Sequence, residues 1–183
     1  MRLLIWIPSL VSLSRLAMTP VVALAILDHR YGAALVWFIA AAFTDIIDGY
    51  LARRFGWMTQ AGAWLDPLAD KAMLVTIYAF LWMAGAIPAW LAGLIFGRDI
   101  LILVMVGAAL ALTKLREFPP SQWGKFCTFS QIVTAVTVMV HGGGLLEGLE
   151  VVLQVMFVVA GGMTGISGAH YFYGGVRRWM GKD

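Results

Sequence analysis

Six apolar segments, each roughly 20 residues long, follow one another along this chain of 183 residues. A helix of about 20 residues crosses a hydrocarbon core of about 30 Å, so segments of this kind can span a bilayer. They are Leu3–Leu27, Ala33–Leu51, Gly62–Gly85, Ala89–Leu112, Phe126–Val140 and Leu149–Tyr173. We expect an all-α integral membrane fold with six transmembrane helices, forming a single domain over residues 1–183.

The composition agrees with a membrane protein. Hydrophobic residues make up 61% of the chain and charged residues 13%, against about 25% charged residues in an ordinary soluble domain. The connections between the segments are too short for a separate soluble domain. Cys127 is the sole cysteine, which excludes an internal disulfide and a thiolate metal site.

The basic residues predict the orientation, because basic connections stay on the cytoplasmic side. The segment ends on one side of the membrane carry Arg2, Arg53, Arg54, Lys114, Arg116, Lys125, Arg177, Arg178 and Lys182. The segment ends on the other side carry Arg30. We therefore expect both termini to be cytoplasmic, with a short interfacial helix at Ile5–Ser9 before the first span. Topology and attraction to anionic headgroups explain the net charge of +3 without a nucleic-acid partner.

Apart from Glu150 at the edge of the last segment, five acidic residues lie inside these apolar segments, where an ionisable side chain is costly and indicates function. They are Asp45, Asp48, Asp66, Asp70 and Asp99. The first two are three residues apart and the next two are four apart, so each pair shares a helix face. A short connection makes their helices antiparallel neighbours. The four carboxylates are therefore expected to converge in the cytoplasmic half.

Convergent carboxylates repel one another unless cations lie between them. Oxygen ligands favour hard ions, so we expect two divalent cations, Mg²⁺ or Mn²⁺. Paired ions of this kind catalyse displacement at phosphorus. Gly49, Ala52 and Gly62 leave room for a substrate, and Arg53 is placed to bind a phosphate.

Simpler interpretations exist for some of these residues. Asp66 before Pro67 is also a typical helix N-cap, and Arg53 with Arg54 is also a topology signal. A cation- or proton-coupled transporter uses intramembrane aspartates too, but it predicts inverted repeats, and none is evident. A structural scaffold leaves four buried carboxylates unexplained.

The stretch from Asp45 to Asp70 reads D-I-I-D-G-Y-L-A-R, eight residues, G, three residues, D, three residues, D. It resembles the signature of the CDP-alcohol phosphotransferase family at every fixed position. The resemblance implies a six-span membrane enzyme that transfers a phosphatidyl or similar group from a CDP-linked donor, typically CDP-diacylglycerol, to an alcohol and releases CMP.

Residue roles follow from the same resemblance. Asp45, Asp48 and Asp66 match ligands of a first metal ion, and Asp70 joins Asp45 and Asp66 around a second. Asp70 also matches the general base that takes the acceptor's proton. The positions that match the CDP-binding part are Asp48, Gly49, Ala52, Arg53 and Gly62. The resemblance further implies membrane lipids as surroundings and, as in many members of the family, a homodimer. As a separate expectation, we place the protein in a bacterial inner membrane.

The signature does not name the acceptor. Arg98 and Lys125 are candidates for binding its phosphate, although Arg98 also has Asp99 as an ion-pair partner and Lys125 also fits an interfacial lysine. The stretch Gly97–Ile102 resembles the cardiolipin synthases of this family. We therefore predict phosphatidylglycerol as acceptor, with glycerol 3-phosphate, the acceptor of phosphatidylglycerophosphate synthases, as the alternative.

Overall fold

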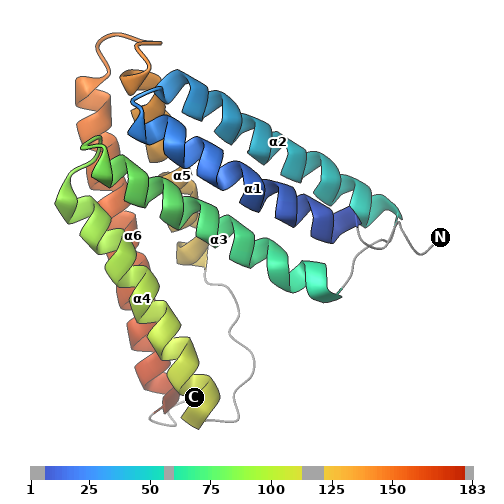
Figure 1. The fold of residues 1–183 in the computed structure, drawn as a ribbon. Coiled ribbons are helices and arrows are strands. Elements are labelled where there is room, and N and C mark those ends of the chain that lie inside the picture. The colour runs from blue at the N-terminus through green and yellow to red at the C-terminus, as the bar shows by residue number, and fades with distance from the viewer. Residues whose placement is uncertain (1–6, 56–59, 113–121, 180–183) are drawn as a thin grey trace. The chain divides into compact units, whose positions relative to one another are not determined.

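A computed structural model describes residues 7–55, 60–112 and 122–179 (Figure 1). Within these ranges, the side chains at 7–15, 45, 48–53, 55, 60–69, 106, 108–112 and 175–179 are outside the description. The elements are α1 Ile7–Leu27, α2 Tyr31–Phe55, α3 Gln60–Met83, α4 Ala89–Leu112, α5 Gln122–Gly142 and α6 Glu150–Trp179.

The prediction of an all-α fold with six helices is confirmed for the described residues. Helix α4 has the predicted bounds, whereas α5 begins four residues before Phe126 and α6 continues six residues past Tyr173. The short helix predicted at Ile5–Ser9 lies partly outside the described residues. Its described part, from Ile7, is continuous with α1.

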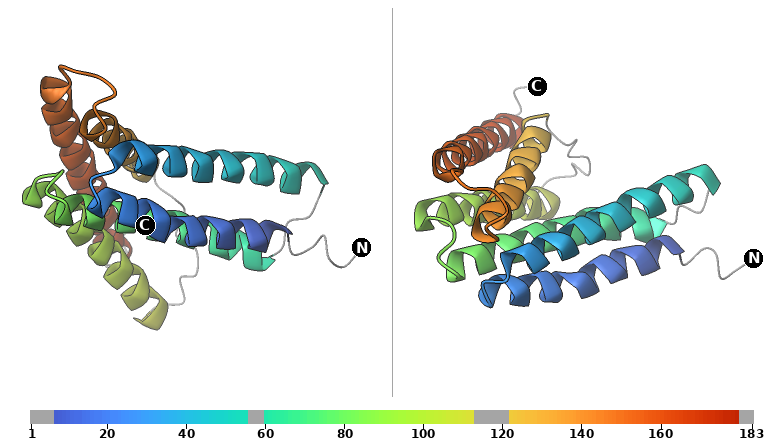
Figure 2. Two further views of the ribbon diagram at one scale, coloured as in Figure 1. Left: turned by 45° about the horizontal axis from the view of Figure 1, so that its top comes forward. Right: turned by 90° about the horizontal axis from the view of Figure 1, so that it is seen from above.

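The first of two compact units contains α1, α2 and α3 together with Val138–Glu147. Helix α1 packs against both α2 and α3 (Figures 1 and 2). The core of this first unit includes Val22 and Ile26 of α1 with Ile77, Tyr78 and Leu81 of α3, all fully buried.

Three helices end with the same hydrogen-bonded turn. At the end of α1, the amide of His29 donates to Ile26 and that of Arg30 donates to Ala25. This is the Schellman pattern, in which one residue adopts the left-handed conformation. His29 (φ 55°) occupies that position in α1, and Gly85 (φ 71°) and Gly144 (φ 64°) occupy it after α3 and α5. These tight ends keep the connections short.

The second unit contains Ile87–Thr137 and Gly148–Asp183, and α4 packs against α6 within it. Gly161 of α6 lies against Trp90 of α4, where an added Cβ would come within 2.6 Å of Trp90 Cζ3. Gly168 faces Arg98 of α4 farther along the same helix. Small residues therefore allow the two helices to approach each other.

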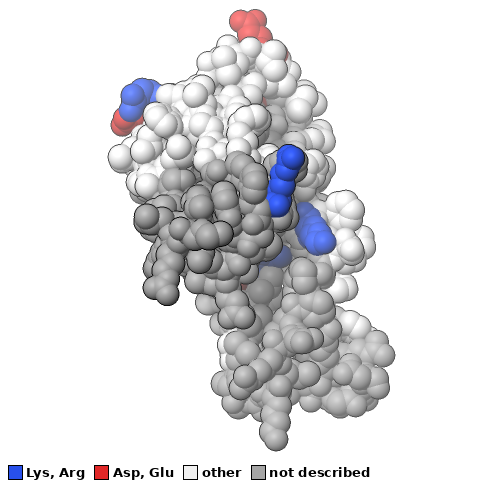
Figure 3. Space-filling model, turned by 90° about the vertical axis from the view of Figure 1, so that its right-hand side faces the viewer, with Lys and Arg blue, Asp and Glu red and all other residues white. Residues whose placement is uncertain are grey.

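Large apolar side chains are exposed on every helix, among them Leu24, Phe43, Trp82, Leu103, Phe129 and Val158. Figure 3 shows few charged side chains on the described part of one face. In water such a surface would promote aggregation, whereas lipid tails would cover it. By length and composition, one helix of the described part, Glu150–Gly174, is able to cross a membrane, and Leu16–Leu27 and Tyr31–Thr44 are shorter apolar helices.

Candidate active site

The four aspartates of the predicted metal site lie on two helices of the first unit. Asp45 and Asp48 lie in the C-terminal half of α2, and Asp66 and Asp70 lie in the N-terminal half of α3. Both helices are continuous through these positions, so each pair shares a helix face. In Figure 1, the C-terminal end of α2 and the N-terminal end of α3 lie at the same end of this unit.

The carboxylates themselves are described at one of the four positions. The side chain of Asp70 is exposed, whereas those of Asp45, Asp48 and Asp66 lie outside the described residues. The described side chains form no group of three or more potential metal ligands. Because three of the four expected ligands are not among them, convergence of the carboxylates stays a prediction.

The residues expected to bind the CDP part lie on the same two helices. Gly49, Ala52 and Arg53 belong to the last two turns of α2, and Gly62 belongs to the first turn of α3. Their contacts also lie outside the described residues, so their roles stay predictions.

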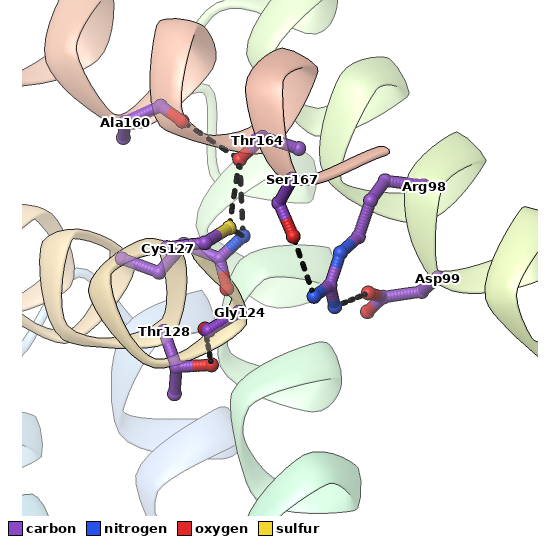
Figure 4. Close-up of polar contacts among 9 residues, drawn as sticks. Arg98, Asp99, Gly124, Cys127, Thr128, Ala160, Thr164 and Ser167 are labelled. Atoms are coloured by element: carbon purple, nitrogen blue, oxygen red, sulfur yellow. Dashed lines mark hydrogen bonds and ion pairs between the residues drawn. The ribbon is translucent and has the colours of Figure 1, made fainter. Parts of the chain in front are cut away.

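Arg98 is described in full and lies within the second unit. Its side chain, on α4, is 10% exposed. The Nη1 atom donates to Asp99 Oδ1 over 2.9 Å, and Nη2 donates to Ser167 Oγ over 3.0 Å (Figure 4). The ion pair that the sequence offered as an alternative role for Arg98 is therefore present.

Two further residues of helix α6 lie next to the Arg98 side chain. The ring of Tyr171 lies with its centroid 5.7 Å from Arg98 Cζ, a distance at which a cation is attracted to an aromatic face. Gly168 lies beside the aliphatic part, where an added Cβ would be 3.6 Å from Arg98 Cγ. Arg98 Nε is buried and has no hydrogen-bond partner among the described residues.

Lys125 lies in the first turn of α5, and its side chain is exposed. Exposure agrees with a role in binding an acceptor and equally with an interfacial lysine. In the next turn, Thr128 donates to the Gly124 carbonyl over 3.1 Å (Figure 4).

A buried polar cluster joins α5 to α6 near Arg98. Gln131 Nε2 donates to Thr164 Oγ1 over 3.2 Å, and Cys127 Sγ lies 3.5 Å from the same hydroxyl (Figure 4). Thr164 in turn donates to the Ala160 carbonyl over 2.7 Å. Thr164 and Ser167 are three residues apart on α6, so neighbouring positions of one helix hold α5 and α4 respectively.

Ser167, Gly168 and Tyr171 were not predicted from the sequence as neighbours of Arg98. A serine among apolar residues was visible, but small polar residues also occur at ordinary helix contacts in membranes. The sequence does not say which helix a residue faces, so the contact between positions 98 and 167 required the structure.

The chain was also compared with known proteins. The sequence model of the CDP-alcohol phosphatidyltransferase family matches residues 5–166, which is most of the chain. The chain belongs to this family. The predicted family is thereby confirmed, and with it the prediction of an enzyme of phospholipid synthesis that transfers phosphatidyl groups.

Named relatives of this phosphatidyltransferase divide between two activities. A probable phosphatidylglycerophosphate synthase of Mycobacterium tuberculosis is 32% identical over 86% of this chain and 77% of the relative. The cardiolipin synthase (CMP-forming) of Rattus norvegicus is 30% identical over 92% of this chain and 61% of the relative. A cardiolipin synthase and hydrolase fusion protein of Schizosaccharomyces pombe is 35% identical over 68% of this chain, which spans 20% of that protein.

Proposed function

We propose that this enzyme transfers the phosphatidyl group of CDP-diacylglycerol to a hydroxyl of phosphatidylglycerol, forming cardiolipin and releasing CMP. The observation that carries the proposal is the arrangement of two aspartate pairs on α2 and α3, in a segment that the family's sequence model covers. The rest of the mechanism is proposed from the chemistry of these residues.

Two divalent cations, Mg²⁺ or Mn²⁺, fit the donor set. The four side chains offer carboxylate oxygens alone, which hard cations prefer, and helical spacing puts each pair on one face. Asp45, Asp48 and Asp66 would hold one ion, and Asp45, Asp66 and Asp70 the other. When bound, the ions neutralise charge on the phosphates and lower the barrier to displacement at phosphorus.

The protein's own groups then orient the reactants. Arg53 binds the donor's phosphates, while Gly49, Ala52 and Gly62 leave room for the CDP part next to the helices. Asp70 takes the proton of the acceptor hydroxyl. The acceptor oxygen forms a bond to the phosphorus that carries diacylglycerol, and the bond from that phosphorus to the CMP oxygen breaks.

The acceptor is proposed from Arg98 and Lys125, which supply positive charge for its phosphate. Phosphatidylglycerol is favoured by the stretch Gly97–Ile102, which resembles cardiolipin synthases, and by the relative of that name in Rattus norvegicus. The second candidate is glycerol 3-phosphate, favoured by the Mycobacterium tuberculosis relative.

The same proposal includes the surroundings of the enzyme. The exposed apolar side chains on every described helix support six membrane spans within one domain. The distribution of Lys and Arg supports cytoplasmic termini and an active site in the cytoplasmic half. A homodimer in a bacterial inner membrane is proposed from the family resemblance.

An acceptor panel tests the proposal. Purified enzyme receives CDP-diacylglycerol and Mg²⁺ or Mn²⁺ with phosphatidylglycerol, glycerol 3-phosphate, inositol phosphate or serine, and CMP release is measured. We expect release with phosphatidylglycerol. Release with glycerol 3-phosphate instead would identify the second candidate, and no release with any acceptor would refute phosphatidyl transfer to this group of alcohols.

Arg98→Ala tests the acceptor site separately. It should raise the acceptor KM and leave the donor KM within about twofold, because Arg98 is proposed to contact the acceptor alone. Arg30→Ala is the matched control, since Arg30 is exposed and paired with Asp28. An equal rise in both KM values would assign Arg98 to the donor site.

A further inference from the structure

Ser167 is a buried hydroxyl on α6 that contacts the charged group of a different helix. It has 0% exposure, and its Oγ accepts a hydrogen bond of 3.0 Å from Arg98 Nη2. In Figure 4 the hydroxyl points at the guanidinium from α6, while Asp99 approaches from the side of α4. The two partners of Arg98 therefore come from two elements.

These two partners constrain Arg98 differently. Asp99 is the next residue along α4, so its ion pair fixes the guanidinium relative to its own helix. Ser167 is 69 positions away in the sequence and fixes the same group relative to α6. An arginine side chain has many rotamers, and two anchors from different helices leave far fewer of them.

The remaining contacts support a fixed plane for the guanidinium. Tyr171 lies one turn after Ser167, with its ring centroid 5.7 Å from Arg98 Cζ. Gly168 leaves the space that the aliphatic part of Arg98 occupies. Meanwhile Nε is buried and has no hydrogen-bond partner among the described residues, so within that part of the chain one donor of the guanidinium is left over. A buried donor without a partner is a feature that a ligand explains.

We propose that Ser167 is a positioning residue of the acceptor site: its hydroxyl fixes the guanidinium of Arg98 in the orientation that binds the acceptor's phosphate. This inference rests on the proposed function, in which Arg98 binds the acceptor. Ser167 acts through Arg98 and does not touch the substrate. The competing explanation is that Ser167 merely packs α4 against α6.

Steady-state kinetics of Ser167→Ala separate the two explanations. The hydroxyl accepts from a charged donor, so its loss should raise the acceptor KM by about tenfold. The values of kcat and the donor KM should stay within about twofold, because the chemistry and the donor site are untouched. Ser167→Thr, which keeps a hydroxyl, should restore most of the acceptor affinity.

Thr134→Val is the matched control for a packing role. Thr134 is also fully buried, and its hydroxyl joins α5 to α6 through the Met156 carbonyl, 3.3 Å away. Its removal should lower the thermal unfolding temperature without raising the acceptor KM. If Ser167→Ala behaves in the same way as Thr134→Val, Ser167 is a packing residue and the inference is overturned.

A double-mutant cycle with Arg98→Ala gives the second readout. In the Arg98→Ala background, Ser167→Ala should change the acceptor KM less than twofold, because the group it positions is gone. A further tenfold rise in that background would overturn the inference. If Arg98→Ala raises the acceptor KM but Ser167→Ala does not, the acceptor site stands and the inference fails. If Arg98→Ala itself leaves the acceptor KM unchanged, both fail.

Discussion

Asp99→Ala should destabilise the enzyme strongly, because it leaves the charge of Arg98 buried. The two side chains keep 10% and 12% of their exposure, and their atoms are 2.9 Å apart. After the substitution, the Nη1 donor loses its carboxylate, and Ser167 and Tyr171 offer no full negative charge. A buried cation without a counter-charge is far more costly than a buried ion pair.

The expected loss of stability in Asp99→Ala follows from the burial of the ion pair. Removing one member of a buried pair costs about 3–5 kcal/mol. In a chain of 183 residues, each kcal/mol corresponds to a shift of about 2–4 °C in the unfolding temperature. We therefore expect the midpoint to fall by about 6–20 °C. Asp99→Asn keeps an oxygen for Nη1 without the charge, so its midpoint should lie between those of Asp99→Ala and the wild type.

The assay is thermal unfolding of the purified enzyme in one detergent at one scan rate. The decisive control is the double substitution Arg98→Met with Asp99→Ala, which removes both charges. Replacing a buried pair with apolar groups is often far less costly than removing one charge, so this variant should unfold at a higher temperature than Asp99→Ala while losing affinity for the acceptor. A midpoint for Asp99→Ala within 2 °C of the wild type, on the order of 1 kcal/mol or less, would show that the Asp99 carboxylate does not compensate the buried charge of Arg98.

Two further substitutions test the packing of each unit. Gly142→Ala should cost about 1–3 kcal/mol, because the new Cβ would lie 2.6 Å from Cδ2 of the buried Tyr31. Gly32→Ala, which meets no atom within 4 Å, should change the unfolding temperature little, and equal effects of the two would contradict the packing. Gln131→Leu should cost about 1 kcal/mol because it removes the hydrogen bonds from Nε2 to Thr164 (3.2 Å) and Cys127 (3.5 Å); an unchanged unfolding temperature would contradict a net contribution from these bonds.

The helices could be predicted from the sequence because the lengths of the apolar segments agree with the positions of helix-breaking residues such as Pro88. Pro88 precedes α4, and that helix has the predicted bounds from Ala89. The largest differences occur where a helix continues beyond its apolar stretch, whereas α3 ends two residues before the predicted Gly85. The predicted span begins at Phe126, yet α5 begins at Gln122. Hydropathy marks what lipid or core can cover, whereas backbone bonding sets where a helix ends.

In the candidate site too, local features could be predicted from the sequence, whereas contacts between helices could not. Asp45, Asp48, Asp66 and Asp70 could be proposed as a site because residues three and four apart share a helix face whatever the tertiary arrangement, and their metal-binding role stays a prediction. The pairing of Arg98 with Asp99 was also visible as a local possibility. Its contact with Ser167 was not, because it depends on how α4 packs against α6, and helical periodicity alone does not specify that packing.

In the proposed mechanism, the aspartates of α2 and α3 hold the metal ions on which phosphatidyl transfer depends. The most direct test is CMP release from CDP-diacylglycerol and phosphatidylglycerol by chelator-treated enzyme titrated with Mg²⁺ or Mn²⁺, for the wild type, Asp70→Asn and the exposed control Asp28→Asn. We predict no release without metal, restoration on addition of either ion for the wild type and the control, and a rate lower by about 10² or more for Asp70→Asn at saturating metal. Metal-independent release, or full activity of Asp70→Asn, would contradict the claim.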